Sequence, residues 1–361
     1  MITMGLRMRR RLRVVGATAL FAVAAGVAAA SAGSAAIVAS NLANPRGIDI
    51  GPGKRLLVVE SATGAVDEIR KGNVQTLATI SGAVDVASQG EGNVYAVVGG
   101  VGPDGPPPPP GAMPGTLVKI DKHGGTTVVA DIAAYAATHP DPDDLDQPPN
   151  PTESNPNGLA LLPGHRVLVS DAAANRLLLV DKNGGITTIA RFRPEQVAWT
   201  LPFPGPGPTV PAEAVPTAVA VGPDGAYYVS ELTGFPFTEG AARIWRVAPG
   251  TVDAVCDPQN IDPNGPCQSV ATGFSSVIDV TFGNNGTMYV LEIAKHGLAG
   301  ALVLGTEFPP IGALWAVKSG SRTLISDTLV APGGVAVDKN HVFVTTSTFG
   351  PPGGTVVDLG G

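Results

Sequence analysis

The sequence predicts an all-β fold made of short strands and tight turns, and three observations lead to that prediction. Glycine and proline are abundant, with 47 and 34 copies among 361 residues, which indicates many turns rather than long helices. Hydrophobic residues make up 44% of the chain and charged residues only 15%, so the chain can bury a large core and is not disordered. One pattern also recurs, in which an apolar strand, a turn of Gly, Asp or Asn and a second apolar strand follow one another.

The repeated pattern occurs six times, and most copies continue into a third strand, a turn and a fourth strand. The first two strands of the copies lie at 47–60, 83–99, 158–171, 218–231, 278–292 and 334–347. Clear third and fourth strands follow at 64–80, 116–132, 176–192 and 313–329. One sheet cannot bury both of its apolar faces, whereas sheets arranged around an axis bury them against their neighbours. We therefore expect a six-bladed β-propeller with four-stranded antiparallel blades; the alternatives are an open solenoid or a seven-bladed ring with one degenerate blade.

The last copy lacks a clear fourth strand. Residues 36–42 (AIVASNL) resemble the fourth strand of the other copies. We expect this N-terminal strand to complete the last blade and to close the ring.

Residues 1–36 are expected to be a secretory signal peptide, which leaves 37–361 as a single propeller domain. Five arginines precede an apolar run at 14–30, and small residues suited to cleavage follow it. The alternative is an uncleaved membrane anchor, for which the run is short. The sequence therefore predicts a secreted, extracellular protein.

Removal of the signal peptide makes the chain more acidic. The segment contains five arginines and no acid, so the mature chain keeps 18 basic and 30 acidic side chains, a net charge of −12. Such a surface repels nucleic acids and anionic lipids, so we expect no nucleic acid partner and no membrane association after cleavage. The expected partner is a small molecule or an extracellular protein, and we expect a monomer.

Two cysteines, Cys256 and Cys267, are expected to form a disulfide, which is the default in an exported protein. The alternative is a pair of free thiols. A bridge across so short a segment is expected to steady a loop and not to hold the fold together.

Loop lengths distinguish the two faces of the expected propeller. The loops after strands two and four of each blade lie on one face, called the top here, and the turns after strands one and three lie on the bottom. The turns after strand one are short, whereas the long segments 99–115, 133–156, 194–215, 232–241 and 294–312 follow strand two or four. The cysteine loop is the exception and falls between strands three and four. Because loops on rigid scaffolds carry function, we expect a binding site on the top face.

Carboxylates recur at the end of strand two. Four copies end in an acid, at Glu60, Asp171, Glu231 and Glu292. Such a ring near the top rim could bind a cation or act in acid–base chemistry. Alternatively, each acid accepts hydrogen bonds from the backbone of its own turn.

A second set of acids lies within strand one, where Asp49, Asp85 and Asp279 occupy a column that other copies fill with alanine. An acid on an apolar face needs a partner. We expect these side chains either to line the central channel or to bond the backbone of a neighbouring blade.

Polar residues also mark the entrances of strand one near the top. Arg46, Asn155 and Asn157 are expected to project towards the channel mouth. Asparagine and carboxylate oxygens together would suit Ca²⁺, and a structural role is the alternative.

The top loops contain two further polar segments. The prolines at 106–110 predict a stiff, extended stretch, which is either solvated or a ligand for a partner. A cluster of carboxylates at Asp141, Asp143, Asp144 and Asp146 would suit a hard cation or form a solvated acidic loop.

Aromatic residues follow Glu231 in the segment SELTGFPF. Phe235 and Phe237 would form the mouth of a ligand site with Glu231, or both rings would pack under their own loop. Sequence motifs for a nucleophilic serine or a catalytic zinc site are absent, and only His139 and His296 fall in top loops.

Several segments resemble the ScyD/ScyE family of exported NHL-type propellers. The resemblance runs over the mature chain and is most specific in SELTGFPF and the downstream RIWRV, with NPRGIDIGPGKRLLVVE (44–60) and GFSSVIDVTFGNNGTMYVLEI (273–293) as further matches. It implies an exported six-bladed propeller of unassigned biochemistry. The cysteine loop and the long proline loop are departures from that family.

The chain also resembles, more distantly, two classes of propeller enzyme. In calcium-dependent lactonases of the regucalcin type, Glu, Asn and Asp side chains hold a metal in the channel, and Asn157 in PNGLA matches one such asparagine. The Glu-Gly-Pro that begins those enzymes is replaced here by Asn44-Pro45-Arg46. Quinoprotein sugar dehydrogenases share the fold and need a catalytic histidine at the top.

The leading hypothesis is an exported propeller, non-catalytic or of unassigned biochemistry, that binds a ligand or partner on its top face. The candidate ligand-binding residues are Arg46, Asn155, Asn157, Glu231, Phe235, Phe237 and Glu292. The alternative is a Ca²⁺-dependent lactonase or hydrolase with Asn157, Glu231, Glu292 and Asp279 as metal ligands. A quinone-dependent dehydrogenase is a third hypothesis.

Overall fold

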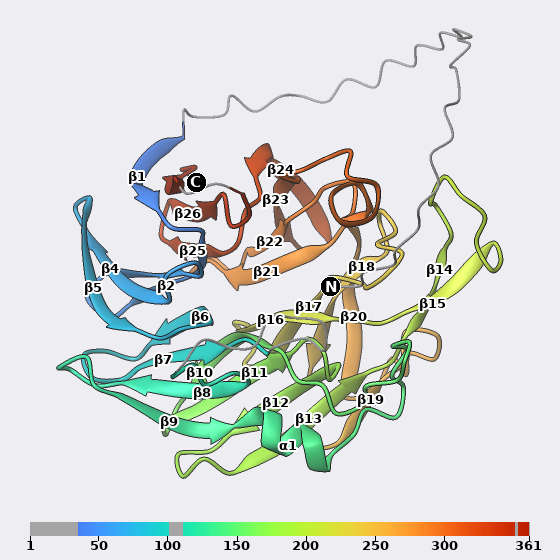
Figure 1. Ribbon diagram of the computed structural model, residues 1–361, viewed down its shortest axis with the longest axis horizontal. Coiled ribbons are helices and arrows are strands. Elements are labelled where there is room, and N and C mark those ends of the chain that lie inside the picture. The colour runs from blue at the N-terminus through green and yellow to red at the C-terminus, as the bar shows by residue number, and fades with distance from the viewer. Residues whose placement is uncertain (1–34, 101–110, 351–352, 361) are drawn as a thin grey trace, which may run out of the picture.

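The computed structural model describes residues 35–100, 111–350 and 353–360. Their strands form six antiparallel sheets around a central axis, so the expected six-bladed β-propeller is confirmed (Figure 1). Nearly all of the expected signal peptide and the prolines at 106–110 lie outside the described residues. Within the described part, no helix has both the length and the hydropathy needed to cross a membrane.

Each of the first three blades runs from an inner to an outer strand in chain order. Blade 1 consists of β2 (Pro45–Gly51), β3 (Arg55–Glu60), β4 (Ala65–Arg70) and β5 (Asn73–Thr79). Blade 2 consists of β6 (Ala83–Ser88), β7 (Val94–Val98), β8 (Thr116–Ile120) and β9 (Thr126–Asp131). Blade 3 consists of β10 (Pro156–Leu162), β11 (Arg166–Asp171), β12 (Arg176–Val180) and β13 (Ile186–Phe192).

The second half of the ring repeats this order. Blade 4 consists of β16 (Pro216–Val221), β17 (Tyr227–Glu231), β18 (Ala242–Val247) and β20 (Cys267–Phe274). Blade 5 consists of β21 (Val277–Phe282), β22 (Met288–Glu292), β23 (Ile311–Lys318) and β24 (Ser321–Val330). Blade 6 consists of β25 (Val335–Asp338), β26 (His341–Thr346), β27 (Gly354–Asp358) and β1 (Ala36–Leu42).

Five further elements lie in the connections. The segment between blades 3 and 4 forms a hairpin of β14 (Glu195–Ala198) and β15 (Thr209–Ala212). The short helix α1 (Ile132–Thr138) follows blade 2, and the π-helical turn η1 (Gly300–Leu304) lies between β22 and β23. The strand β19 (Ala254–Cys256) lies between β18 and β20. The long segments 133–156, 194–215, 232–241 and 294–312 all follow strand two or four of a blade, as predicted, and so belong to the top face, while most of the segment 99–115 lies outside the described residues.

The N-terminal strand closes the ring as expected. β1 pairs antiparallel with β27, and Ile37 lies opposite Val357. The outer strand of blade 6 therefore comes from the beginning of the chain, and the two ends of the domain are joined by backbone hydrogen bonds.

The hydrophobic core is divided among the gaps between blades. Six clusters of buried apolar side chains each combine residues from two neighbouring blades, including the pair formed by blades 6 and 1. Trp245, for example, is fully buried and packs between blades 3 and 4. Burial of apolar surface between sheets thus stabilises the ring, as the repeat pattern requires.

The disulfide between Cys256 and Cys267 is present, with Cα atoms 5.4 Å apart. Its loop lies between strands three and four of blade 4, as predicted, but β19 within that loop pairs in parallel with β13 of blade 3. Both cysteines are buried in the core cluster between these blades. The bridged loop therefore also adds a fifth strand to the neighbouring blade, which the sequence pattern did not indicate.

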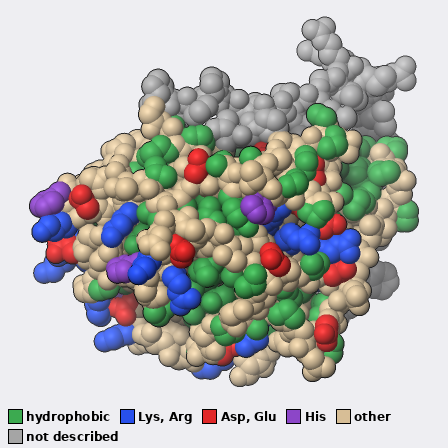
Figure 2. Space-filling view, turned by 90° about the horizontal axis from the view of Figure 1, so that it is seen from below, with side chains coloured by type: hydrophobic (Ala, Val, Ile, Leu, Met, Phe, Trp, Pro, Cys, Tyr) green, Lys and Arg blue, Asp and Glu red, His purple; other side chains and the backbone are tan. Residues whose placement is uncertain are grey.

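Charged side chains of both signs are interspersed on the side of the molecule that Figure 2 shows. Exposed ion pairs such as Arg246 with Asp224, 2.7 Å between Nε and Oδ2, join strand three of a blade to its strand-one turn. Pairs of this kind contribute little to stability because water screens them. The fold therefore depends mainly on the buried clusters between blades.

Candidate functional site

The six inner strands surround a cavity of about 370 Å³ in the central channel. Most of its lining residues are aliphatic, and its polar residues include Asp49, Asp85, Asp279, Ser88 and Gln89. The lining extends to the ends of the inner strands, so the cavity reaches from the middle of the channel towards the bottom rim.

Each of the three channel aspartates bonds to the blade that follows its own. Asp49 Oδ2 accepts a hydrogen bond from Ser88 N at 2.8 Å. In the same way, Asp85 Oδ2 accepts from Leu159 N at 3.0 Å, and Asp279 Oδ2 accepts from Val335 N at 2.7 Å. Both interpretations of these residues thus hold at once, since the carboxylates line the channel and also tie neighbouring blades together.

The aspartates lie at two levels of the channel, although the sequence pattern aligned them in one column. Asp49 pairs with Leu57, three residues before the end of strand two, whereas Asp279 pairs with Leu291, one residue before that end. Asp85 lies at the level of Asp279. A shift by two residues keeps a side chain on the same face of a strand, so periodicity alone cannot detect it.

Burial raises the pKa of all three channel carboxyl groups. The pKa of Asp49 rises to about 6 and that of Asp279 to about 7. The pKa of Asp85 also lies well above its ordinary value, because of burial first and repulsion by Asp279 second. Hydrogen bonds from backbone N–H groups favour the charged forms and oppose the shifts. The channel therefore contains acids that titrate near neutral pH.

The upper end of the channel is closed by Arg46 and Asn157. Arg46 Nη2 donates a hydrogen bond to Asn157 Oδ1, and Asn157 Nδ2 donates to Thr217 O at 2.7 Å. Asn157 is almost fully buried. The amide of Asn157 is therefore engaged at both ends, and the structure brings these two predicted residues together. Asp279 lines the same small space.

Asn155 does not join them. Its Oδ1 accepts a hydrogen bond from Gly100 N at 3.0 Å, and its backbone N–H donates to Asp171 Oδ1 at 2.7 Å. Asp171 is fully buried and also accepts from Ser154 Oγ and Ala174 N. Both residues thus hold the entrance of blade 3, and the capping role considered for Asp171 is the one the structure describes.

Glu231 and Glu292 make the same contact in adjacent blades. Each carboxylate accepts a hydrogen bond from the indole N–H of a tryptophan in strand three of its own blade. Glu231 accepts from Trp245, and Glu292 accepts from Trp315 at 2.9 Å. Glu292 also accepts from Ser275 N at 2.7 Å. These acids are buried parts of the blades, not open ligands at the rim.

Burial raises the pKa of both acids, to about 8 for Glu231, while the indole N–H groups lower it. Arg243 Nε lies 3.2 Å from Glu231 Oε2, and its positive charge also favours the carboxylate. Arg243 Nη2 also donates a hydrogen bond to Glu195 Oε2, at the start of the β14–β15 hairpin. Glu231 therefore supports the base of the hairpin. Glu60, by contrast, is partly exposed and accepts from Thr63 Oγ1 at 3.0 Å.

Phe235 and Phe237 differ in their surroundings. Phe237 packs against the core cluster between blades 5 and 6. Phe235 is 45% exposed and makes an edge-to-face contact with Trp199, with ring centroids 5.6 Å apart. Trp199 makes a second edge-to-face contact with Phe203, which is 44% exposed. We call Trp199, Phe203 and Phe235 the aromatic surface.

Hydrogen bonds fix the aromatic surface on the top face. Thr238 Oγ1 donates to Ala198 O at 2.7 Å, and Gly234 N donates to Glu213 O at 2.8 Å, so the Phe235 loop is held against the hairpin. Trp199 Nε1 donates to Phe203 O at 2.8 Å, which satisfies the indole and orients its ring. The three rings are therefore arranged before any ligand binds.

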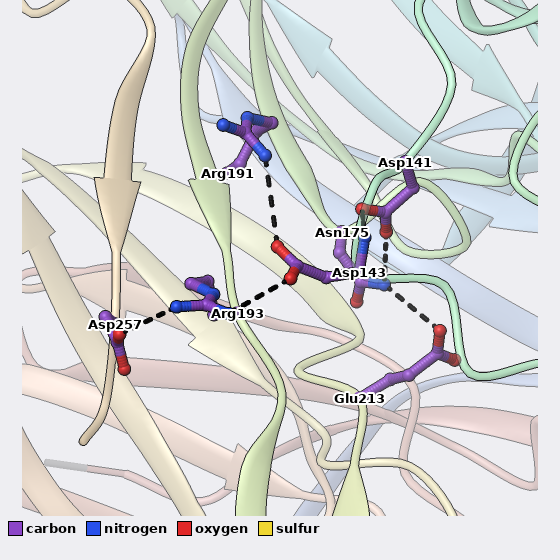
Figure 3. A network of polar contacts seen from close by, with 7 residues as sticks. All are labelled: Asp141, Asp143, Asn175, Arg191, Arg193, Glu213 and Asp257. Carbon is purple, nitrogen blue, oxygen red and sulfur yellow. Dashed lines mark hydrogen bonds and ion pairs between the residues drawn. The ribbon is translucent and has the colours of Figure 1, made fainter.

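The acidic loop after α1 is bound to the blades rather than solvated. Asp143 forms ion pairs with Arg193 at 3.3 Å and Arg191 at 3.9 Å, and Arg193 also pairs with Asp257 of the cysteine loop (Figure 3). Asp141 is 6% exposed and accepts from Asn175 Nδ2 at 3.0 Å.

Glu213 completes this network. Its Oε1 accepts from Leu145 N at 3.1 Å and lies 3.4 Å from Asn175 Nδ2. Burial raises the pKa of Glu213 to about 7, and the neighbouring carboxylates add to the rise. Asp144 accepts from the backbone N–H groups of Asp146 and Asn150. The acids thus order the loop.

The described residues do not fit a calcium centre. No three His, Cys, Asp or Glu side chains in that part of the chain are grouped as a metal site requires. Of the four proposed ligands, Asn157 is bonded to Arg46, while Glu231 and Glu292 face separate tryptophans. No mechanistic step through Ca²⁺ follows from this arrangement.

Histidine is also missing from the channel cavity among the described residues. His139 stacks on Tyr135 with ring centroids 3.9 Å apart, and His296 lies 3.3 Å from Glu239 in an exposed pair. Both histidines lie in top-face connections, where the quinoprotein resemblance requires one, but neither lines the channel cavity.

Sequence reasoning missed Trp199, Phe203 and the two tryptophans that bind Glu231 and Glu292. A partial signal for the latter exists, because two of the three copies that end strand two in Glu also carry Trp in strand three, in RIWRV and ALWAV, whereas the copy that ends in Glu60 does not. The contact between Trp199 and Phe235 joins two separate top loops, and nothing in the spacing of either loop indicates it.

Comparisons with known proteins agree with the fold. No protein-family model matches the sequence, and neither does any curated protein. Among solved structures, a gluconolactonase from Xanthomonas campestris is similar with a TM-score of 0.54 at 10% identity, over 88% of this chain and 86% of that chain. An aldose sugar dehydrogenase from Streptomyces coelicolor, in its PQQ-bound form, gives 0.52 at 14% identity, over 90% and 96%. A streptogramin B lyase gives 0.50 at 13% identity, over 88% and 94%. At such identities the likeness establishes the propeller fold alone.

Proposed function

We propose that the chain is an exported, non-catalytic propeller that binds a ligand through the aromatic surface on its top face. The ligand presents an apolar ring face, as a sugar ring or a planar aromatic does. The segments SELTGFPF and RIWRV support placing the chain with the ScyD/ScyE family, and the expected signal peptide supports export. The polar top-face candidates Arg46, Asn157, Glu231 and Glu292 would then hold the scaffold that presents the rings.

One observation carries this proposal: the side chains of Phe203 and Phe235 are nearly half exposed to solvent, although both rings are held in contact with Trp199. Exposed aromatic side chains cost free energy in water and are common energetic centres of binding sites. The hydrogen bonds of Thr238 and Gly234 hold their loop in place, so little ordering would be required on binding.

The test uses the fluorescence of Trp199 against a panel of soluble oligosaccharides and planar aromatic dyes. Of the three tryptophans, Trp245 is buried and Trp315 is bonded to Glu292, so Trp199 is the one in contact with the exposed rings. A ligand should change the emission of the wild type and leave that of Trp199→Phe unchanged. We expect Phe203→Ala/Phe235→Ala to weaken binding about tenfold or more.

The proposal would be wrong if the double variant, with unchanged circular dichroism and melting temperature, bound the ligand as tightly as the wild type. The calcium-dependent lactonase has weaker support, because all four of its candidate ligands are hydrogen-bonded within the fold. The dehydrogenase hypothesis lacks a histidine at the channel in the described residues.

A further inference from the structure

Arg46 enters the channel from blade 1 with its backbone fixed by blade 6. Its carbonyl oxygen accepts a hydrogen bond from Thr345 Oγ1 at 2.7 Å. Gly333 lies so close that a Cβ there would come within 3.0 Å of Arg46 Cα. The absence of a side chain at Gly333 therefore permits this approach, and the start of β2 is held where Arg46 can reach across the channel.

The side chain of Arg46 reaches blade 3. Its Nη2 donates to Asn157 Oδ1, while Asn157 Nδ2 donates to Thr217 O of blade 4. The second bond fixes which end of the amide faces Arg46, since only the oxygen can accept from a guanidinium. Asn157 is thus oriented as an oxygen ligand for a cation, and that cation is Arg46.

Two channel carboxyl groups line the same small space as the guanidinium. These groups belong to Asp85 and Asp279; burial lowers the pKa of Arg46, and the charge of Asp85 opposes that lowering. Asp85 can approach because position 47 is glycine, where any Cβ would overlap the carboxylate. In their charged forms Asp85 and Asp279 repel each other, and a cation in the same space reduces that repulsion. An arginine keeps its charge under all ordinary conditions.

The space around these groups is nearly filled. The remaining cavity between Arg46, Asn157, Asp85 and Asp279 measures about 10 Å³, at the lower limit for a single water molecule. A hydrated divalent ion with its ligand shell does not fit beside the guanidinium.

We propose that Arg46 is the built-in cation of the channel: its guanidinium occupies the place of a metal ion among Asn157, Asp85 and Asp279, and it links blades 1 and 3 across the opening. The upper channel then needs no bound metal to stay ordered. This inference concerns the channel and does not depend on the ligand proposed for the aromatic surface.

The test compares melting temperatures of Arg46→Met, Asp85→Asn and the double variant, with Arg166→Met as the matched control. Arg166 is exposed on the bottom side, so its loss should shift the melting temperature by no more than about 1 °C. Arg46→Met should lower it by about 3–8 °C, because the carboxylates lose their counter-charge. In the Asp85→Asn background the same change should lower it by at most about half as much, because one repelling charge is already gone.

The proposal would be overturned if the effects of Arg46→Met and Asp85→Asn on the melting temperature were additive, or if the Arg46→Met protein were as stable as the wild type. If the Arg46→Met single variant does not fold, the account requires that the Arg46→Met/Asp85→Asn double variant folds. Failure of both variants to fold would contradict the account. Millimolar Ca²⁺ gives a second measurement on the wild type. A rise in melting temperature that is lost in Asp85→Asn would place a metal in the channel and refute the proposal, whereas no rise, or a rise kept in Asp85→Asn, supports it.

Discussion

Glu231 and Phe235 lie four residues apart in one top-face segment, yet they end in opposite environments. Glu231 is 2% exposed and is bound by Trp245 and Arg243, so its carboxyl group supports the base of the hairpin. Phe235 is 45% exposed and touches Trp199 from another loop. The polar residue that resembles a site residue is used by the fold, and the apolar residue that the fold could have buried is left on the surface.

This contrast holds for the top face in general. Arg46, Asn157 and Glu292 have their polar atoms bonded inside the protein, whereas Phe203 and Phe235 keep much of their ring area exposed. Polar groups next to buried backbone must find partners, so their presence near a rim is weak evidence for a ligand. Exposed aromatic groups have no such structural need and are stronger evidence for binding.

The largest expected effect separates Glu231 from Phe235. Glu231→Ala should lower the free energy of unfolding by about 3–5 kcal/mol, because it leaves the Trp245 indole unpaired and Arg243 without one of its two carboxylates. Phe235→Ala should change it by less than about 1 kcal/mol. Urea unfolding followed by circular dichroism measures both. Glu231→Gln keeps an acceptor for the indole and should fall between them; equal effects for Glu231→Ala and Phe235→Ala would remove the contrast.

The cysteine loop extends the comparison to the bottom face. Cys256→Ala/Cys267→Ala should lower the free energy of unfolding by about 2–3 kcal/mol, because the unfolded chain gains freedom. The loop should also release β19 from β13, which hydrogen exchange would detect as faster exchange at the Arg193 N–H, since it donates to Cys256 O at 3.0 Å. Unchanged protection there would mean that the strand pairing does not need the bridge.

The channel acids predict a smaller, pH-dependent effect. Burial raises the pKa of Asp49 to about 6 and of Asp279 to about 7 in the folded protein, so between pH of about 4 and 7 the folded state binds more protons than the unfolded state. Stability should therefore fall as the pH rises, by about 1–2 kcal/mol between pH of about 6 and 8. Melting temperatures at the two pH values measure this slope.

Asp279→Asn should flatten the slope, since the titrating group is removed. Asp121→Asn is the matched control: Asp121 is exposed, and backbone hydrogen bonds lower its pKa, so it does not titrate in this range. If stability fell equally with pH in the wild type and Asp279→Asn, or if it rose with pH, the claim that the channel buries Asp279 and raises its pKa would be contradicted.

The sequence was sufficient for the ring and insufficient for the site. Period-two strands and turn residues predicted six blades, the closing strand 36–42 and the top-face loops, because those depend on local pattern and repetition. The difference in level between Asp49 and the pair of Asp85 and Asp279 was not predicted, because a two-residue shift along a strand leaves the alternating pattern of its faces unchanged. The contact between Trp199 and Phe235 joins different loops, and such long-range packing has no signature in either segment.

The most direct test of the central claim compares two exposed phenylalanines on the top face. Phe235 belongs to the aromatic surface, while Phe349, which is 39% exposed, lies in the loop between β26 and β27 of blade 6. For any oligosaccharide or dye that changes Trp199 emission, the account predicts that Phe235→Ala weakens binding about tenfold and that Phe349→Ala leaves it unchanged. Equal affinities of both variants and the wild type would contradict the claim that the aromatic surface holds the ligand.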